Sequence, residues 1–172
     1  MVDVVLEFLE NLFGSSYLGR CAVVFLMSML PAVGGPSMAI PIGAVLGLPA
    51  FPNALASIVG NILPSPVVII FVRRVFAWMR KKSQRLGRLA DKFESKAKKR
   101  GASFRHGMFA GLLIFVAIPL PLPGMGAWTG SLIAALFDVR LKTALPAIAI
   151  GVIIAGTIAA GVTYGFISLA FG

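Results

Sequence analysis

The chain has 172 residues, of which 58% are hydrophobic and only 13% are charged. Three stretches contain no Asp, Glu, Lys or Arg, namely 21–72, 106–137 and 143–172. A water-soluble domain carries about 25% charged residues, and a helix of roughly 20 apolar residues crosses the ~30 Å hydrocarbon core of a bilayer. These features exclude an ordinary soluble domain and predict a single transmembrane domain over 1–172.

Catalytic and metal-binding side chains are scarce in this sequence. Cys21 is the only cysteine and His106 is the only histidine. An intrachain disulfide is therefore impossible, and sites built from clusters of thiolates or imidazoles are excluded. We accordingly expect no enzyme activity, no catalytic residue, no metal ion and no cofactor.

The net charge of +10 is concentrated between Arg73 and Arg105, where thirteen Lys and Arg residues accompany only Asp91 and Glu94. In a soluble protein such a segment would indicate nucleic-acid binding. Between two apolar blocks it indicates a cytoplasmic loop, because cytoplasmic loops of membrane proteins carry an excess of Lys and Arg. We therefore expect a multi-pass protein of the plasma membrane with the basic loop 80–105 in the cytoplasm, both termini outside and no nucleic-acid partner.

The first half of the chain predicts two short helices and one long span. Residues 1–14 form an amphipathic segment that is too short and too acidic to cross, and we expect it to lie in the membrane interface. Repeat one, 15–80, contains a helix over 17–30 capped by Ser15 or Ser16, a break rich in Pro and Gly, a helix over 37–48, and a span from Asn53 to about Met79 kinked by Pro64 and Pro66. The first of these helices is about 21 Å long at 1.5 Å per residue, which is less than a full crossing.

The second half predicts the same order of elements. A basic linker with an amphipathic helix occupies 81–103. Repeat two, 104–172, contains a helix over 104–118, a Pro-rich break over 119–126, a helix over 127–136 and a span over 141–169. An internal match between the halves pairs residues 87 positions apart: Pro36, Met38 and Gly43 with Pro123, Met125 and Gly130.

These elements predict an all-α integral membrane protein. Pro and Gly runs interrupt helices, and freed backbone groups at membrane depth are tolerated only within protein or beside a water-filled cavity. We therefore expect an inverted repeat of two units, each a re-entrant helical hairpin followed by a spanning helix. By the positive-inside pattern, hairpin one opens outside and hairpin two inside. The alternative is a bundle of four to six ordinary helices with Pro kinks.

The breaks are the candidate substrate site, because Pro- and Gly-interrupted segments in both halves indicate a midplane site in transporters. The returning half-helices begin near Ser37 and Gly126, and their N-termini carry partial positive charge suited to an anionic group. The alternative role for polar residues here, Ser131 included, is to bond helices together, and that for Arg73 and Arg74 is to anchor the cytoplasmic face. The candidate substrate-binding residues are Pro31, Gly34, Gly35, Pro36, Ser37, Pro41, Asn61, Pro64, Arg73, Arg74, Pro119, Pro121, Pro123, Gly124, Gly126, Trp128 and Thr129.

Three segments carry a resemblance to a known family: MAIPIGAVLGLP (38–49), VGNILPSP (59–66) and FVAIPLPLPGMGAWTGSLIAALF (115–137). They resemble the small multidrug export protein family of the DedA-like (VTT-domain) membrane superfamily. The resemblance implies re-entrant hairpins in inverted repeats, and lipid-carrier flipping, phospholipid scrambling or proton-coupled transport. Related proteins often carry an acidic and a basic residue before the Ala-Ile-Pro, where this chain has Gly34, Gly35, Pro36 and Ser37.

The functional expectation is transport of a lipid, a lipid-carrier phosphate or another amphiphile through a midplane site. The stretches 21–72, 106–137 and 143–172 contain no Asp, Glu, Lys or Arg that would serve as a proton relay, which favours downhill or ion-independent movement. The alternatives are a small-molecule or multidrug exporter and, from another class, a non-transporting scaffold or accessory subunit. Expected partners are anionic membrane lipids near the basic loop, a phosphate-bearing or amphiphilic substrate, and a second copy in a homodimer.

Overall fold

The computed structural model describes residues 16–31, 35–82, 107–119 and 126–171. All regular secondary structure within these ranges is helical, which confirms the all-α prediction for this part of the chain. The predicted interfacial segment 1–14 and the amphipathic helix of the basic linker lie outside the described residues.

The first half contains four helices, and each boundary has a local cause. Helix α2 (Tyr17–Met29) begins after Ser16, whose Oγ accepts a hydrogen bond from the Gly19 N–H at 3.2 Å; this confirms the predicted Ser cap. Helix α3 (Pro36–Val45) begins with a proline at its first position, where a missing N–H costs nothing. Helices α4 (Ala50–Ile62) and α5 (Pro64–Lys82) complete the half.

The predicted single kinked span from Asn53 to Met79 is two helices joined end to end at Leu63. Pro64 explains the break. A proline lacks the N–H that would continue the hydrogen bonds of the preceding helix, and it is favoured at the first position of a new helix. Taken together, Ala50–Met79 is still long and apolar enough to cross a membrane.

The second half contains α7 (Met108–Ala117), α8 (Ala127–Leu136) and α9 (Leu141–Phe171). Helix α8 has the bounds that the sequence predicts, and Leu141–Ala170 is a second apolar stretch of spanning length. The starts of α7, α8 and α9 each follow the starts of α2, α3 and α4 by 91 residues. The 87-residue register expected from Pro36 and Pro123 is therefore wrong by about one helical turn.

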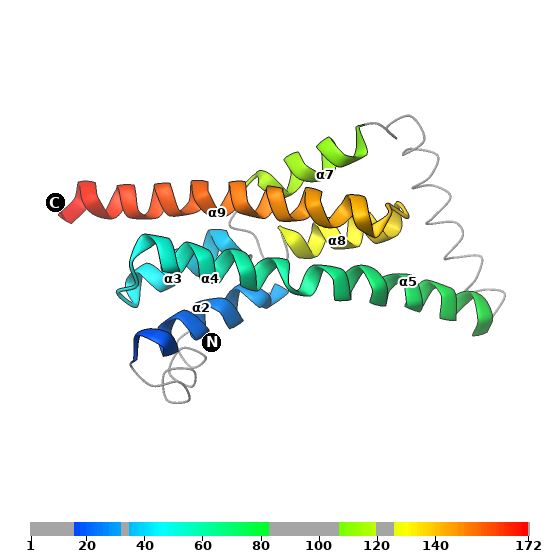
Figure 1. The fold of residues 1–172 in the computed structure, drawn as a ribbon, viewed down its shortest axis with the longest axis horizontal. Helices are drawn as coiled ribbons and strands as arrows, with labels where there is room; N and C mark the ends of the chain where they lie inside the picture. The colour runs from blue at the N-terminus through cyan, green and yellow to red at the C-terminus, as the bar shows by residue number, and fades with distance from the viewer. Residues whose placement is uncertain (1–15, 32–34, 83–106, 120–125, 172) are drawn as a thin grey trace.

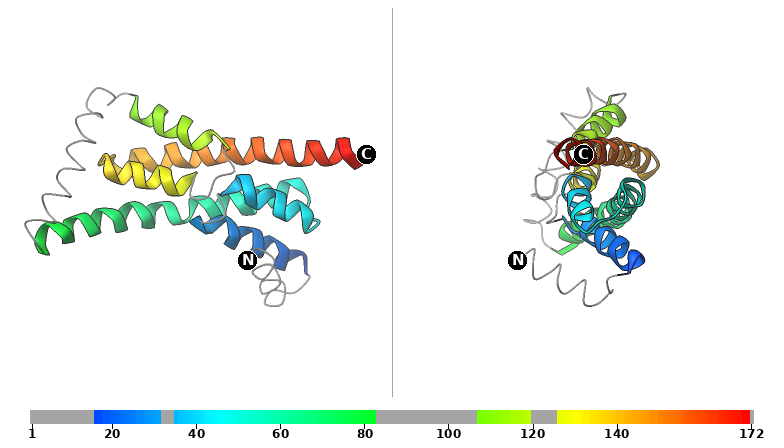
Figure 2. Two further views of the ribbon diagram at one scale, coloured as in Figure 1. Left: turned by 180° about the vertical axis from the view of Figure 1, so that it is seen from behind. Right: turned by 90° about the vertical axis from the view of Figure 1, so that its left-hand side faces the viewer.

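Figure 1 shows the arrangement of the helices, with the α4–α5 pair and α9 running antiparallel along the length of the molecule. Helices α2 and α3 lie toward the end where α4 starts, here called the Ala50 end. Helices α7 and α8 lie toward the end where α9 starts, here called the Leu141 end. The view from behind in Figure 2 shows the same order, with the starts of α3 and α8 near the middle.

Two glycines allow the short helices to approach the long ones. A Cβ added at Gly60 of α4 would lie 2.3 Å from the backbone oxygen of Phe25 in α2. A Cβ added at Gly151 of α9 would lie 2.8 Å from Cβ of Val116 in α7 and 2.9 Å from the oxygen of Leu113. Such close contact of backbones is how small residues stabilise helix pairs in membranes. Gly60 and Gly151 are themselves 91 residues apart.

Candidate functional site

The starts of α3 and α8 meet at the middle of the molecule, and each follows a glycine with unusual backbone geometry. Gly35 has φ 67° and ψ −146°, and Gly126 has φ 98° and ψ −138°. This region of backbone space is open to glycine and strained for any other residue. The two glycines therefore let the chain turn abruptly out of each break and into a helix.

Asn61 of α4 lies between these two helix starts. A Cβ built on Gly35 would lie 2.7 Å from Nδ2 of Asn61, and one built on Gly126 would lie 3.3 Å from the same atom. The Asn61 side chain is fully buried, and neither Nδ2 nor Oδ1 has a hydrogen-bond partner among the described residues. A buried amide without a partner costs roughly 1–3 kcal/mol, and among the described residues Asn61 makes no side-chain hydrogen bond that would stabilise the fold.

Trp128 of α8 makes a hydrogen bond to the end of α2. Its Nε1–H donates a hydrogen bond of 3.0 Å to the Met29 carbonyl oxygen at the end of α2. The Met29 carbonyl is at the C-terminal end of α2, and the last carbonyls of a helix have no hydrogen-bond partner within that helix. The indole therefore satisfies a free backbone acceptor and joins the two breaks, so its N–H is not available to a ligand in this conformation.

A stripe of polar side chains runs along the buried face of α4 and the start of α5. Its members recur every four residues and are all fully buried; they are Asn53, Ser57, Asn61 and Ser65. Residues four apart lie on one side of a helix. The sequence interpretation identified only Asn61 of these, although the four-residue spacing is visible in the sequence.

At the Ala50 end of the molecule, Asn53 of the stripe takes part in a hydrogen-bond network. Asn53 Nδ2 donates to the Ile40 carbonyl at 2.8 Å and to the Tyr164 hydroxyl oxygen at 2.9 Å, and that hydroxyl donates to the Leu48 carbonyl. Tyr164 belongs to α9, so these bonds join the turn after α3 to the second long helix.

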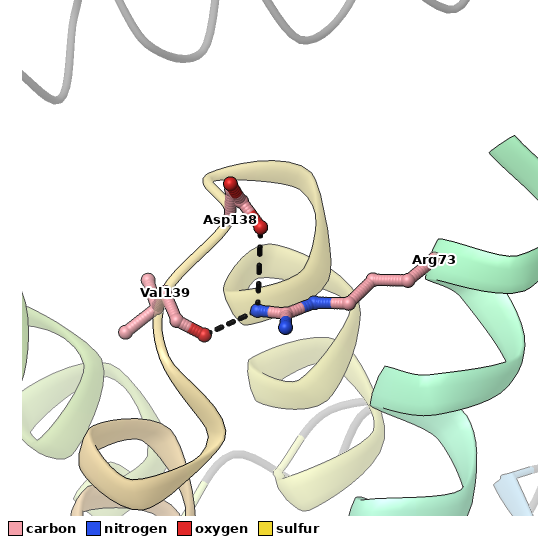
Figure 3. A network of polar contacts seen from close by, with 3 residues as sticks. All are labelled: Arg73, Asp138 and Val139. Carbon is pink, nitrogen blue, oxygen red and sulfur yellow. Dashed lines mark hydrogen bonds and ion pairs between the residues drawn. The ribbon is translucent and has the colours of Figure 1, made fainter. Parts of the chain in front are cut away.

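An equivalent contact holds the turn after α8 at the Leu141 end (Figure 3). Arg73 of α5 donates through Nη2 to the Val139 carbonyl, and the same nitrogen lies 3.6 Å from Asp138 Oδ1. Arg73 and Tyr164 are 91 residues apart, as are Val139 and Leu48. Since both charged side chains are partly exposed, the ion pair contributes at most about 1 kcal/mol, and the main effect of Arg73 is to position the turn.

The Tyr164 contact leads to a prediction. We expect Tyr164→Phe to lower the free energy of unfolding by about 1–2 kcal/mol, because the Leu48 carbonyl loses its donor and Asn53 loses an acceptor. The measurement is thermal unfolding of purified protein in detergent. Ser168→Ala, which removes an exposed hydroxyl from the next turn of α9, serves as control; equal midpoints for the two variants would contradict the contact.

The structure brings together only part of the predicted substrate-binding set. Gly35 and Gly126 both lie beside the Asn61 side chain, and Pro36, Ser37, Trp128 and Thr129 lie in the first turns of α3 and α8. Residues outside the described ranges are Gly34, Pro121, Pro123 and Gly124.

The other predicted residues lie elsewhere. Pro31 is exposed after α2, Pro41 lies inside α3, and Pro64 is buried at the start of α5. Pro119 is half-buried after α7. Arg73 and Arg74 are at least twelve residues beyond Asn61, about 18 Å along a helix, so they belong to the Leu141 end and not to the central junction.

In the described part of the chain, two apolar stretches of spanning length, short apolar helices packed against them and an uncharged polar junction in the middle are typical of a helical membrane protein. A family model described as "Putative small multi-drug export protein" matches residues 36–158, from the start of α3 into α9. The chain therefore belongs to the small multi-drug export protein family, whose description names drug export. Comparisons with curated proteins and with solved structures gave no match.

Proposed function

We propose that this protein carries a lipid, a lipid-carrier phosphate or another amphiphile across the plasma membrane, through a site between the tips of two re-entrant hairpins. The observation that carries the proposal is Asn61, a fully buried amide without a partner among the described residues, set between two helix N-termini. Polar groups are expensive within a membrane and are commonly retained for substrate contact.

The proposed architecture is an inverted repeat. Its support is the constant 91-residue separation of helix starts, of the close-contact glycines and of the Arg73 and Tyr164 contacts. The helices of each short pair have 10 to 13 residues, about 15–20 Å at 1.5 Å per residue, which is too short to cross a ~30 Å core. This arrangement is common to transporters with midplane sites and is compatible with the DedA-like superfamily.

The proposed orientation follows from the charges at the two ends. Lys82, Arg140 and Lys142 lie at the Leu141 end, whereas Arg20 is the one basic residue that the described ranges place near the Ala50 end. Arg20 donates to the Leu46 carbonyl at 2.9 Å and so caps the end of α3. We assign the Leu141 end to the cytoplasm by the positive-inside pattern, with both termini outside and anionic lipids around the basic loop.

An anionic headgroup suits the electrostatics of the junction. The N-termini of α3 and α8 each present partial positive charge and backbone N–H groups, and Asn61 Nδ2 adds a donor. The apolar tail of such a substrate would remain against the exposed apolar faces of the helices, for example at Leu132 and Ile154. A homodimer would leave this site within each protomer.

The proposal is tested by reconstituting the purified protein into vesicles and following fluorescent phospholipid and polyprenyl phosphate between leaflets. We expect movement above that of protein-free vesicles. If neither lipid moves and expression instead raises resistance to amphiphilic drugs, the protein is a small-molecule exporter. If neither activity appears and the protein purifies with a fixed partner, the scaffold hypothesis holds.

A further inference from the structure

The polar atoms that lack partners are unevenly distributed along the molecule. In the described part of the chain, six buried side-chain atoms have no hydrogen-bond partner. Five of them lie at Asn61 or toward the Leu141 end: both polar atoms of Asn61, the Ser65 and Ser131 hydroxyls, and Arg73 Nε. The sixth is Asn53 Oδ1.

On the Ala50 side of Asn61, most polar side-chain atoms of the stripe have hydrogen-bond partners. Ser28 Oγ donates to the Ser57 carbonyl at 2.7 Å and lies 3.1 Å from Ser57 Oγ, and Asn53 Nδ2 has two acceptors. Ser57 and Ser65 are therefore a contrasting pair. Each is a fully buried serine four residues from Asn61 in opposite directions, yet only the Ser57 hydroxyl has a partner among the described residues.

Ser65 and Ser131 lie at similar depth below the junction. Helices α5 and α8 are packed together and both run from the middle toward the Leu141 end (Figure 1). Ser65 is four residues after Asn61, and Ser131 is five residues after Gly126, which contacts Asn61. At 1.5 Å per residue these steps are about 6 and 7.5 Å. The unpaired hydroxyls of Ser65 and Ser131 thus lie at similar heights on two helices that pack against each other.

We propose that this region is a hydration site, in which ordered water molecules bind Asn61, Ser65 and Ser131 on the Leu141 side of the junction. Buried water commonly makes about three hydrogen bonds to polar groups that would otherwise be unpaired. Ile69, which is fully buried, lies one helical turn beyond Ser65. The site is wet on one side of Asn61 and dry on the other.

The difference in hydration between the two sides of Asn61 indicates the side on which a substrate headgroup is solvated. This consequence rests on the proposed function. Water at Ser65 and Ser131 would solvate a polar headgroup that moves between Asn61 and the Leu141 end, while the paired Ser28 and Ser57 close the opposite route in this conformation. The presence of the water does not depend on transport, so the hydration site and the transport activity can fail separately.

The test uses hydroxyl radicals produced from bound water by X-ray irradiation, followed by mass spectrometry of cysteine oxidation. Cys21→Ala provides the background, and Ser65→Cys, Ser131→Cys and Ser57→Cys are compared after gel filtration shows that each is folded. We expect oxidation at positions 65 and 131 to be at least about tenfold faster than at 57, since thiols are oxidised where water reaches them. Ala134→Cys, on α8 with Ser131 and equally buried, is the dry control.

Two further results bear on the proposal. Adding Asn61→Leu to the Ser65→Cys protein removes two water ligands and is expected to slow oxidation at position 65. Equal rates at positions 57, 65, 131 and 134, or an unchanged rate with Asn61→Leu, would overturn the hydration site. If Ser65→Cys does not fold, the comparison of Ser131→Cys with Ala134→Cys decides the question on its own.

Discussion

Asn61→Leu is expected to reduce transport at least about tenfold without lowering the free energy of unfolding of the protein. The leucine has a similar volume and removes two polar atoms that have no partner among the described residues, so folding loses no hydrogen bond between described residues. A bound headgroup would lose a donor, and a loss of about 1.4 kcal/mol already corresponds to a tenfold weaker interaction. Vesicle transport and thermal unfolding are measured on the same preparations.

Asn53→Leu is the matched control for this prediction. Asn53 has the same residue type, helix and burial as Asn61, but its Nδ2 donates to the Ile40 carbonyl and to Tyr164. We expect Asn53→Leu to lower the free energy of unfolding by about 1–3 kcal/mol, because two acceptors are left without this donor. A large loss of stability in Asn61→Leu, or full transport by it, would contradict the assigned role.

Gly60→Ala and Gly151→Ala are expected to destabilise the protein by about 1–3 kcal/mol each, or to prevent folding. The added methyl group at Gly60 meets the backbone oxygen of Phe25, and that at Gly151 meets Val116 and the backbone of α7. Backbone atoms cannot rotate out of the way as side chains do, so the helices must separate and lose their packing. Thermal unfolding in detergent measures both effects.

The controls for these glycines have the opposite expected sign. Gly111 and Gly161 are also helical, but a Cβ added to either has no atom within 4 Å among its surroundings. Gly111→Ala and Gly161→Ala should therefore stabilise their helices by up to about 1 kcal/mol, the difference in helix propensity between alanine and glycine. Equal effects at all four positions would mean that close helix packing does not stabilise this fold.

The helices were predictable because apolar runs without charge and clusters of Pro and Gly are local signals. The prediction of a helix over 127–136 is confirmed, and so is the Ser cap before Tyr17. The 87-residue register between the halves was wrong because it paired two prolines that lie at different distances from the start of the next helix. Pro36 is the first residue of α3, whereas Pro123 precedes the start of α8 at Ala127 by four residues.

The site was only partly predictable. Asn61 and the glycines at the helix starts follow from the Pro and Gly breaks, but the contacts that organise the ends join distant residues. Tyr164 binds a carbonyl 116 residues away, and Arg73 binds one 66 residues away. No local pattern specifies such pairs. Ser57 and Ser65 were overlooked because serine in membrane helices is commonly assigned to helix–helix contacts, which describes Ser57 but not Ser65.

The proposed transport site requires that the short helix pairs enter the membrane from opposite faces and stop at its middle. The direct measurement is labelling of single cysteines by a membrane-impermeant maleimide, from each side of oriented vesicles, in a Cys21→Ala background. The variants are Tyr17→Cys and Ala170→Cys at the Ala50 end, Lys82→Cys at the Leu141 end, and Pro31→Cys at the tip of the first pair.

We predict that positions 17 and 170 are labelled only from outside, that position 82 is labelled only from the cytoplasm, and that position 31 is not labelled from the cytoplasm. The last result separates a hairpin that stops midway from two helices that cross completely, since only a complete crossing would bring Pro31 to the opposite face. Labelling of position 31 from the cytoplasm, or of positions 17 and 82 from one side, would contradict the account.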